Sequence, residues 1–104
     1  MNIKSIRALQ EELSTLIGVS GHEGDVGNFI LEIIEKENLA DKVWIDPLGN
    51  VLAIKKGVTD TEKILLDAHI DEIGFMISHI EKNGFLRFVP VGGWDVRILL
   101  GQPV

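Results

Sequence analysis

Residues 65–74 read Leu-Leu-Asp-Ala-His-Ile-Asp-Glu-Ile-Gly, and this stretch decides how the chain is interpreted. The apolar run at residues 64–66 predicts a strand whose polar end carries Asp67, His69 and Asp71. Alternate side chains of a strand share one face, with Cα atoms about 6.5–7 Å apart. Open α/β sheets bind their ligands at the carboxyl ends of strands. We therefore expect an α/β fold with a polar site at this strand end.

His69 and Asp71 are the residue types that a metal site needs. A neutral imidazole binds a divalent metal through one ring nitrogen, while a carboxylate accepts the other N–H and fixes the tautomer. Asp67 shares their face, which gives it a supporting role. A polar–apolar alternation is also typical of any half-exposed strand. The pattern alone therefore leaves both interpretations open.

Composition limits the function classes. The 104 residues are 45% apolar and 25% charged, which is typical of one globular domain at most. A net charge of −6 and a pI near 4.9 argue against nucleic acid or an anionic membrane as a partner. Without cysteine, a metal site has to use imidazole and carboxylate groups. The N-terminus shows no leader pattern and no stretch is transmembrane-like, so we expect a cytoplasmic location.

The N-terminal third is helical in pattern. Apolar residues recur at helical spacing over residues 6–17, which predicts an amphipathic helix ended by Gly18. Ser20 and Glu23 have the spacing of a capping box. A second helix is therefore expected to begin there and to continue through Ile34.

After residue 38 the pattern becomes extended. Strands are expected at residues 43–46, 51–56, 75–80 and 85–89. Pro-Leu-Gly-Asn at residues 47–50 forms the first turn, and Asn83-Gly84 forms a hairpin turn. Residues 90–94 are expected to be a loop in which Trp94 is a packed anchor. The apolar residues 98–104 lack a cap or a polar tail, which predicts an interrupted chain.

Four segments carry a family resemblance. They are Ser20-Gly21-His22-Glu23, Asp46-Pro47-Leu48-Gly49-Asn50, Ala68-His69-Ile70-Asp71-Glu72-Ile73-Gly74-Phe75 and Val91-Gly92-Gly93-Trp94. In order and spacing they resemble the tetrahedral aminopeptidases, and the likeness covers essentially the whole chain. These dinuclear metallopeptidases are also called glutamyl aminopeptidases and, historically, endoglucanases or cellulases. The last two names find no support here, since nothing places two carboxyls on either side of a glycosidic bond.

The resemblance implies a function. The family members are hydrolases that remove N-terminal residues from peptides with two divalent metal ions, zinc or cobalt, and they form homo-oligomers. By that likeness His69 is a metal ligand, and Asp71 is the catalytic-site carboxylate that orients it. The family's other ligands and its general-base Glu lie beyond residue 104. We therefore expect an incomplete metal site and no activity from the isolated chain.

The resemblance also implies a domain division. Residues 1–71 would be the N-terminal fragment of a zinc-exopeptidase-like α/β/α catalytic domain. Residues 72–104 would begin an inserted β-barrel domain that is used in oligomerisation. The alternative is a non-catalytic truncated product, or an interaction or oligomerisation module. Its unpaired strands and apolar faces would associate with another subunit.

The remaining candidate ligands have simpler explanations. His22 lies in the predicted capping turn, where a polar residue is expected in any case. His79 falls within a strand, where a histidine at the surface or one with satisfied hydrogen bonds is expected rather than a ligand. Glu72 follows the motif on the opposite face, which is typical of a residue at an element boundary.

Overall fold

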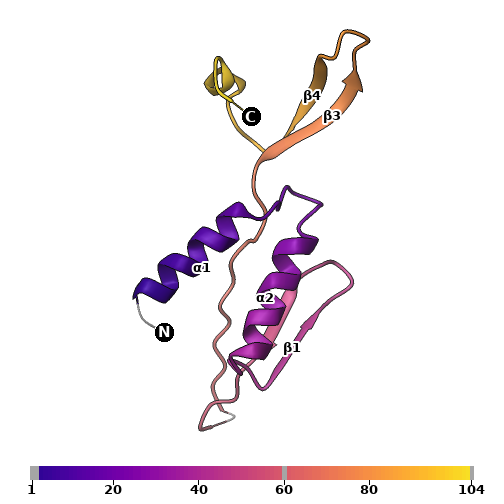
Figure 1. Cartoon of the computed structure of the whole chain (residues 1–104). Coiled ribbons are helices and arrows are strands. Elements are labelled where there is room, and N and C mark those ends of the chain that lie inside the picture. The colour runs from indigo at the N-terminus through magenta and orange to yellow at the C-terminus, as the bar shows by residue number, and fades with distance from the viewer. Residues whose placement is uncertain (1–2, 60, 104) are drawn as a thin grey trace.

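The computed structural model describes residues 3–59 and 61–103 and shows a small α/β arrangement (Figure 1). In chain order the elements are α1 (Ile3–Thr15), α2 (Gly24–Lys36), β1 (Lys42–Ile45), β2 (Val51–Ile54), β3 (Gly74–Ile80), β4 (Leu86–Val91) and a 3₁₀ helix (Val96–Leu99). β1 pairs with β2 and β3 pairs with β4, each antiparallel. The α/β class predicted from the sequence is confirmed at this level.

The first packed unit of the fold consists of α2 and the β1–β2 hairpin. α2 contacts both strands, and Val26 on its first turns is only 5% exposed. The hairpin register pairs Lys42 with Ile54 and Ile45 with Val51. The turn at residues 47–50 is confirmed, although the second strand ends at Ile54 rather than at residue 56.

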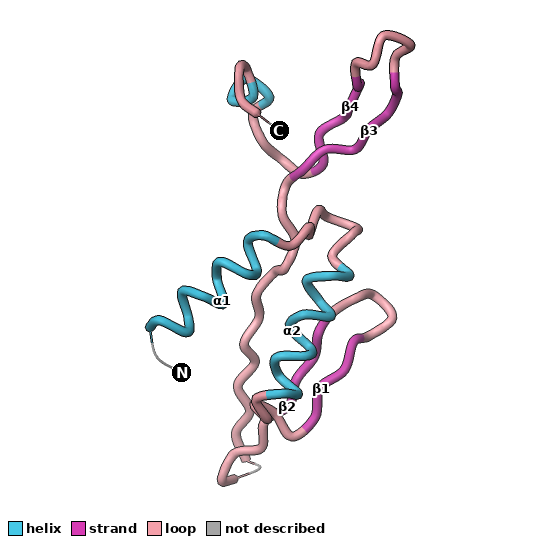
Figure 2. Tube along the Cα trace, in the orientation of Figure 1, coloured by secondary structure: helices cyan, strands magenta, loops and turns pink. Residues whose placement is uncertain are grey.

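The strand predicted from the apolar run at residues 64–66 does not form in the described residues, because this segment has no paired neighbour, and that prediction is wrong. Ile64, Leu65 and Leu66 are 89%, 88% and 90% exposed. A strand needs a neighbour for its backbone hydrogen bonds, but β1 and β2 use each other. Figure 2 accordingly draws this segment as a loop between β2 and β3.

The second sheet is the β3–β4 hairpin, which extends away from the helices (Figure 1). Gly84 has a φ of 90°, as the predicted Asn-Gly turn requires. Phe75 forms edge contacts with Phe88 and Trp94, at ring-centroid distances of 4.7 and 5.1 Å. The Trp94 Nε1–H donates to the Val91 carbonyl at 3.2 Å, so Trp94 is the packed anchor that was expected.

Pro90 belongs to β4 rather than to the predicted loop, which is a correction. It lies opposite Phe75 in the register. β4 is paired on one side only among the described residues. Proline lacks an N–H and is tolerated on such an edge strand.

The chain leaves an unusually large surface uncovered. Its accessible surface is 9305 Å², whereas a compact monomer of this mass exposes about 5800 Å². The radius of gyration is 18.3 Å, compared with about 13 Å for a compact domain of this length. Most large apolar side chains are therefore not covered by the described residues. Among those residues, no helix combines the length and apolar character needed to cross a membrane.

Candidate functional site

The loop before α2 is attached to the end of the extended segment. The Glu72 N–H donates to the Gly18 carbonyl at 2.8 Å, and the Ser20 N–H donates to the Glu72 carbonyl at 3.3 Å. Val19 and Glu72 thus form a parallel bridge. The Glu72 carboxylate also accepts from the Gly18 N–H at 3.4 Å. Glu72 was expected to be only a boundary residue, but it holds two distant segments together.

Gly18 permits this close approach. A Cβ added at Gly18 would lie 2.8 Å from a methyl group of the buried Val26 and 3.4 Å from the Ile70 carbonyl oxygen. The first distance is well below van der Waals contact. A residue without a side chain is therefore needed where the loop passes between α2 and the extended segment.

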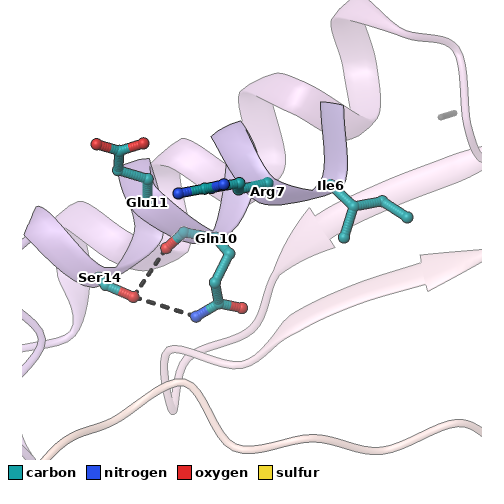
Figure 3. Close-up of a pocket in the computed structure, with 5 residues that line it drawn as sticks. All are labelled: Ile6, Arg7, Gln10, Glu11 and Ser14. Atoms are coloured by element: carbon teal, nitrogen blue, oxygen red, sulfur yellow. Dashed lines mark hydrogen bonds between the residues drawn. The ribbon is translucent and has the colours of Figure 1, made fainter. Parts of the chain in front are cut away.

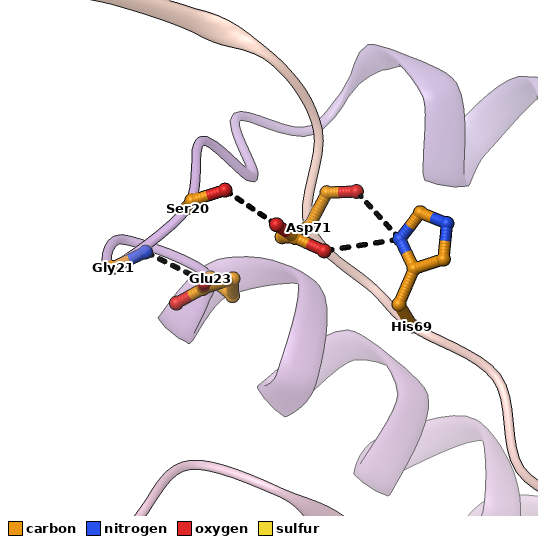
Figure 4. A network of polar contacts seen from close by, with 5 residues as sticks. All are labelled: Ser20, Gly21, Glu23, His69 and Asp71. Carbon is orange, nitrogen blue, oxygen red and sulfur yellow. Dashed lines mark hydrogen bonds and ion pairs between the residues drawn. The ribbon is translucent and has the colours of Figure 1, made fainter. Parts of the chain in front are cut away.

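His69 and Asp71 contact each other directly (Figure 4). The Nδ1 atom of His69 lies 3.0 Å from Asp71 Oδ1 and 3.1 Å from the Asp71 carbonyl oxygen. Because both neighbours are acceptors, Nδ1 carries the hydrogen, and in the neutral ring Nε2 then keeps a free lone pair. The His69 side chain is 86% exposed and that of Asp71 is 39% exposed. An imidazole in this tautomer is prepared to bind a cation through Nε2.

Ser20 is the second partner of Asp71. Its Oγ–H donates a hydrogen bond to Asp71 Oδ2, the carboxylate oxygen that His69 does not use (Figure 4). This bond is the main cause that lowers the pKa of Asp71 below its ordinary value. Partial desolvation opposes the shift, and the hydrogen bond and charge of His69 add to it.

The capping box predicted from Ser20 and Glu23 is therefore wrong. α2 begins at Gly24, and Glu23 at its N-cap makes no side-chain capping hydrogen bond. The Glu23 carboxylate instead accepts from the Gly21 N–H at 2.6 Å. The hydroxyl of Ser20 is used across the fold by Asp71, which local sequence spacing does not reveal.

An open groove of about 830 Å³ passes this site. Three stretches line it, namely Glu23 and Ile30, residues 48–52, and residues 65–71. His69, Asp71 and Asp67 therefore share one groove, and the apolar Leu65 and Leu66 continue its wall. The groove therefore has a polar end at His69 and Asp71 and an apolar wall at Leu65 and Leu66.

The opposite wall depends on the turn after β1. Asp46 Oδ1 accepts from the backbone N–H groups of Leu48 and Asn50, each at 2.9 Å. The Asn50 side-chain amide donates to Asp46 Oδ2, also at 2.9 Å. That side-chain bond is the main cause that lowers the pKa of Asp46. The turn is fixed by its own residues and presents a stable edge to the groove.

The comparisons with known proteins agree with the geometry. Residues 49–104, just over half of the chain, match the model of the M42 glutamyl aminopeptidase family. The chain belongs to that family. Members of the M42 family are peptidases and are generally metal-dependent.

Relatives of known sequence and structure are similar over most of this M42 chain. A lysyl aminopeptidase from Pyrococcus furiosus is 42% identical over 88 residues, which are 84% of this chain and 24% of the relative. A TET aminopeptidase from a marine sediment Thaumarchaeota archaeon is 40% identical with a TM-score of 0.85, over 98% of this chain and 28% of that one. A Thermotoga maritima protein named endoglucanase is 51% identical with a TM-score of 0.76, over 85% and 28%. The chain spans about a quarter of the length of the curated relatives that it matches.

The donor groups present fit a metal in part. His69 has the tautomer and the carboxylate partner that are typical of a metal-ligating histidine. However, within residues 3–59 and 61–103 no three His, Asp or Glu side chains converge in a way that would hold an ion. In the described part of the M42 chain, the structure supplies one exposed imidazole whose Nδ1 is bonded to a carboxylate.

The other candidate residues lie elsewhere. His22 is exposed in the loop before α2, and Nε2 of His79 lies 3.9 Å from Glu81 on the distant hairpin. A second, shallow depression lies on α1, where Ser14 and Gln10 bond each other within one helix (Figure 3). None of these features adds a ligand next to His69.

Proposed function

We propose that this M42 chain is part of a metal-dependent aminopeptidase that hydrolyses N-terminal residues from peptides. The observation that carries the proposal is the pair of acceptors on His69 Nδ1, which leaves Nε2 free on a ring that lines an open groove. In the proposed role, His69 binds a divalent ion through Nε2, and Asp71 holds the ring in place. The family match and the aminopeptidase relatives support this role.

When bound, two divalent ions such as zinc or cobalt would polarise the scissile carbonyl and activate a water molecule. The residues of this chain would hold and orient one of these ions. His69 supplies one ligand, Asp71 accepts its Nδ1–H, and Asp67 at the groove wall has a supporting role.

The proposed function extends to architecture and partners. We propose that residues 1–71 form part of an α/β/α catalytic domain and that residues 72–104 start an inserted β-barrel domain. The way the β3–β4 hairpin extends from the helices supports this division (Figure 1). A homo-oligomer is proposed for the complete enzyme, since the hairpin exposes Met76, Ile77 and Phe88 by 43–50%. The cytoplasmic location expected from the sequence stays a prediction.

The proposed enzyme has to be tested with a polypeptide of the relatives' length. Its hydrolysis of aminoacyl p-nitroanilides with zinc or cobalt is measured for the wild type, His69→Ala and His79→Ala. We expect His69→Ala to lower kcat/KM at least 100-fold, because a metal ligand is lost. His79→Ala is the matched control on the distant hairpin, and its activity should stay within twofold of the wild type. Equal activity of the two variants would contradict the proposal.

We further propose that the isolated 104 residues are inactive, because the described residues supply too few ligands. Calorimetric titration of this chain with zinc should show no micromolar binding of two ions. Tight binding of two ions, lost in His69→Ala, would overturn this part of the proposal.

The alternative function is a non-catalytic interaction or oligomerisation module, and the excess exposed surface favours it. Exposed apolar patches of this kind mark association surfaces. This chain is mixed with a separately expressed polypeptide that covers the rest of the relatives' length. Sedimentation velocity then measures association, and a peptidase assay of the same mixture distinguishes the two functions. Association that restores no peptide hydrolysis would favour the module.

A further inference from the structure

The carboxylate of Asp71 is held at both oxygens by different parts of the chain. Oδ1 accepts from His69 at 3.0 Å, and Oδ2 accepts from the Ser20 hydroxyl. Rotation about the Cβ–Cγ bond moves both oxygens away from their donors, so a second donor adds a second bond that this rotation would break. The second donor therefore fixes the direction in which Oδ1 faces the imidazole.

The position of Ser20 is set independently of Asp71. Its backbone N–H is bonded to the Glu72 carbonyl, and the preceding Gly18 is pressed against Val26. These contacts bring the Ser20 side chain to the segment that carries His69 and Asp71. Figure 4 shows Ser20, Asp71 and His69 as a continuous chain of polar contacts.

The simpler role for Ser20, a helix cap, does not apply. α2 begins four residues later at Gly24, and its N-cap residue is Glu23. The hydroxyl therefore makes its described bond to a group outside its own segment.

We propose that Ser20 is a positioning residue for His69, acting through Asp71. Ser20 holds Asp71 so that its carboxylate accepts the Nδ1–H, and Asp71 keeps His69 Nε2 directed at the groove as a cation ligand. The inference rests on the proposed function of His69. Partners of this kind, which orient a ligand without touching the ion, typically change metal affinity about 10- to 100-fold.

The experiment compares Ser20→Ala with Ser14→Ala in the complete protein. Ser14 is the matched control, because its hydroxyl donates only to the Gln10 carbonyl within α1. Zinc affinity is measured by calorimetry, and the ¹⁵N shifts of the His69 ring are measured in the metal-free protein. We expect Ser20→Ala to weaken zinc binding about 10-fold or more and to move the ring shifts away from the Nδ1–H form. Ser14→Ala should change neither value.

A second pair of variants, matched to each other in shape, separates the effect of losing the hydroxyl from the effect of changing the side-chain volume. Ser20→Thr keeps the hydroxyl and should retain the wild-type ring shifts and zinc affinity to within threefold. Ser20→Val has the shape of the threonine variant but no hydroxyl, and it should behave as Ser20→Ala. This pair also keeps the test valid if Ser20→Ala fails to fold.

The proposal is overturned if Ser20→Ala and Ser20→Val keep the wild-type ring shifts, whatever their zinc affinity. It is equally overturned if the ring shifts move and zinc affinity does not. A wild type that binds no zinc would instead refute the proposed function of His69. The ring shifts of the metal-free protein would still decide whether Ser20 acts through Asp71.

Discussion

The two ends of the extended segment differ sharply. At its apolar end, Leu65 and Leu66 are 88% and 90% exposed and have no strand beside them in the described chain. At its polar end, Asp71 and Glu72 are bonded to the loop at residues 18–20. The polar end is fixed by contacts within this chain, whereas the apolar end has no such contacts among the described residues. The candidate metal ligand lies at the end that is already fixed.

Leu65→Ala gives the largest expected contrast between the two ends. In the isolated 104 residues it should change the free energy of unfolding by less than about 0.5 kcal/mol, because the side chain touches little. In a gene product of the relatives' length, loss of a covered leucine should cost about 2–5 kcal/mol. Thermal unfolding followed by circular dichroism measures both values. Similar small changes in both proteins would show that nothing covers the apolar end.

Gly18→Val tests the polar end with an effect of intermediate size. The added side chain collides with Val26 and should destabilise the protein by about 1–3 kcal/mol, in the isolated chain as well as in the complete protein. Gly24→Ala is the control, because its Cβ would meet nothing within 4 Å at the start of α2. It should be neutral or stabilise by up to about 1 kcal/mol. A Gly18→Val variant as stable as Gly24→Ala would contradict the close contact.

Asp46 gives the smallest expected effect and tests the opposite wall of the groove. Its pKa is lowered in the folded state, mainly by the Asn50 side chain. Its contribution to stability is thus present above the unfolded-state pKa of about 3.9 and is lost as the pH falls through the lower folded value. Melting temperatures recorded from about pH 6 to pH 2 should fall less steeply for Asp46→Asn than for the wild type. An Asp46→Asn variant that keeps the wild-type slope would contradict this contribution.

Much of the local structure could be predicted from the sequence. Asn83-Gly84 and the turn at residues 47–50 correctly predicted both hairpins, because turn chemistry depends on neighbouring residues. The period of the apolar residues predicted both helices, since a helical face repeats every 3.6 residues.

The failures involve non-local partners. The spacing of Ser20 and Glu23 suggested a capping box, but Ser20 bonds Asp71, 51 positions along the chain. The apolar run at residues 64–66 suggested a strand, and its pairing requires neighbours that the described residues do not supply. The contact between His69 and Asp71 is local and followed from their alternation, whereas their roles in a metal site stay predictions. The Ser-Gly-His-Glu string was the signal in the sequence that singled out Ser20. Its spacing predicted a helix-capping role, whereas the hydroxyl bonds Asp71.

The central claim is that His69 binds a metal through Nε2 while Asp71 holds its Nδ1. A crystal structure of the complete protein with zinc, with the metal located by anomalous scattering, tests it most directly. The account predicts an ion about 2.0–2.1 Å from His69 Nε2, with Nδ1 still bonded to Asp71. An ion bound without His69, or bound through Nδ1, would contradict it.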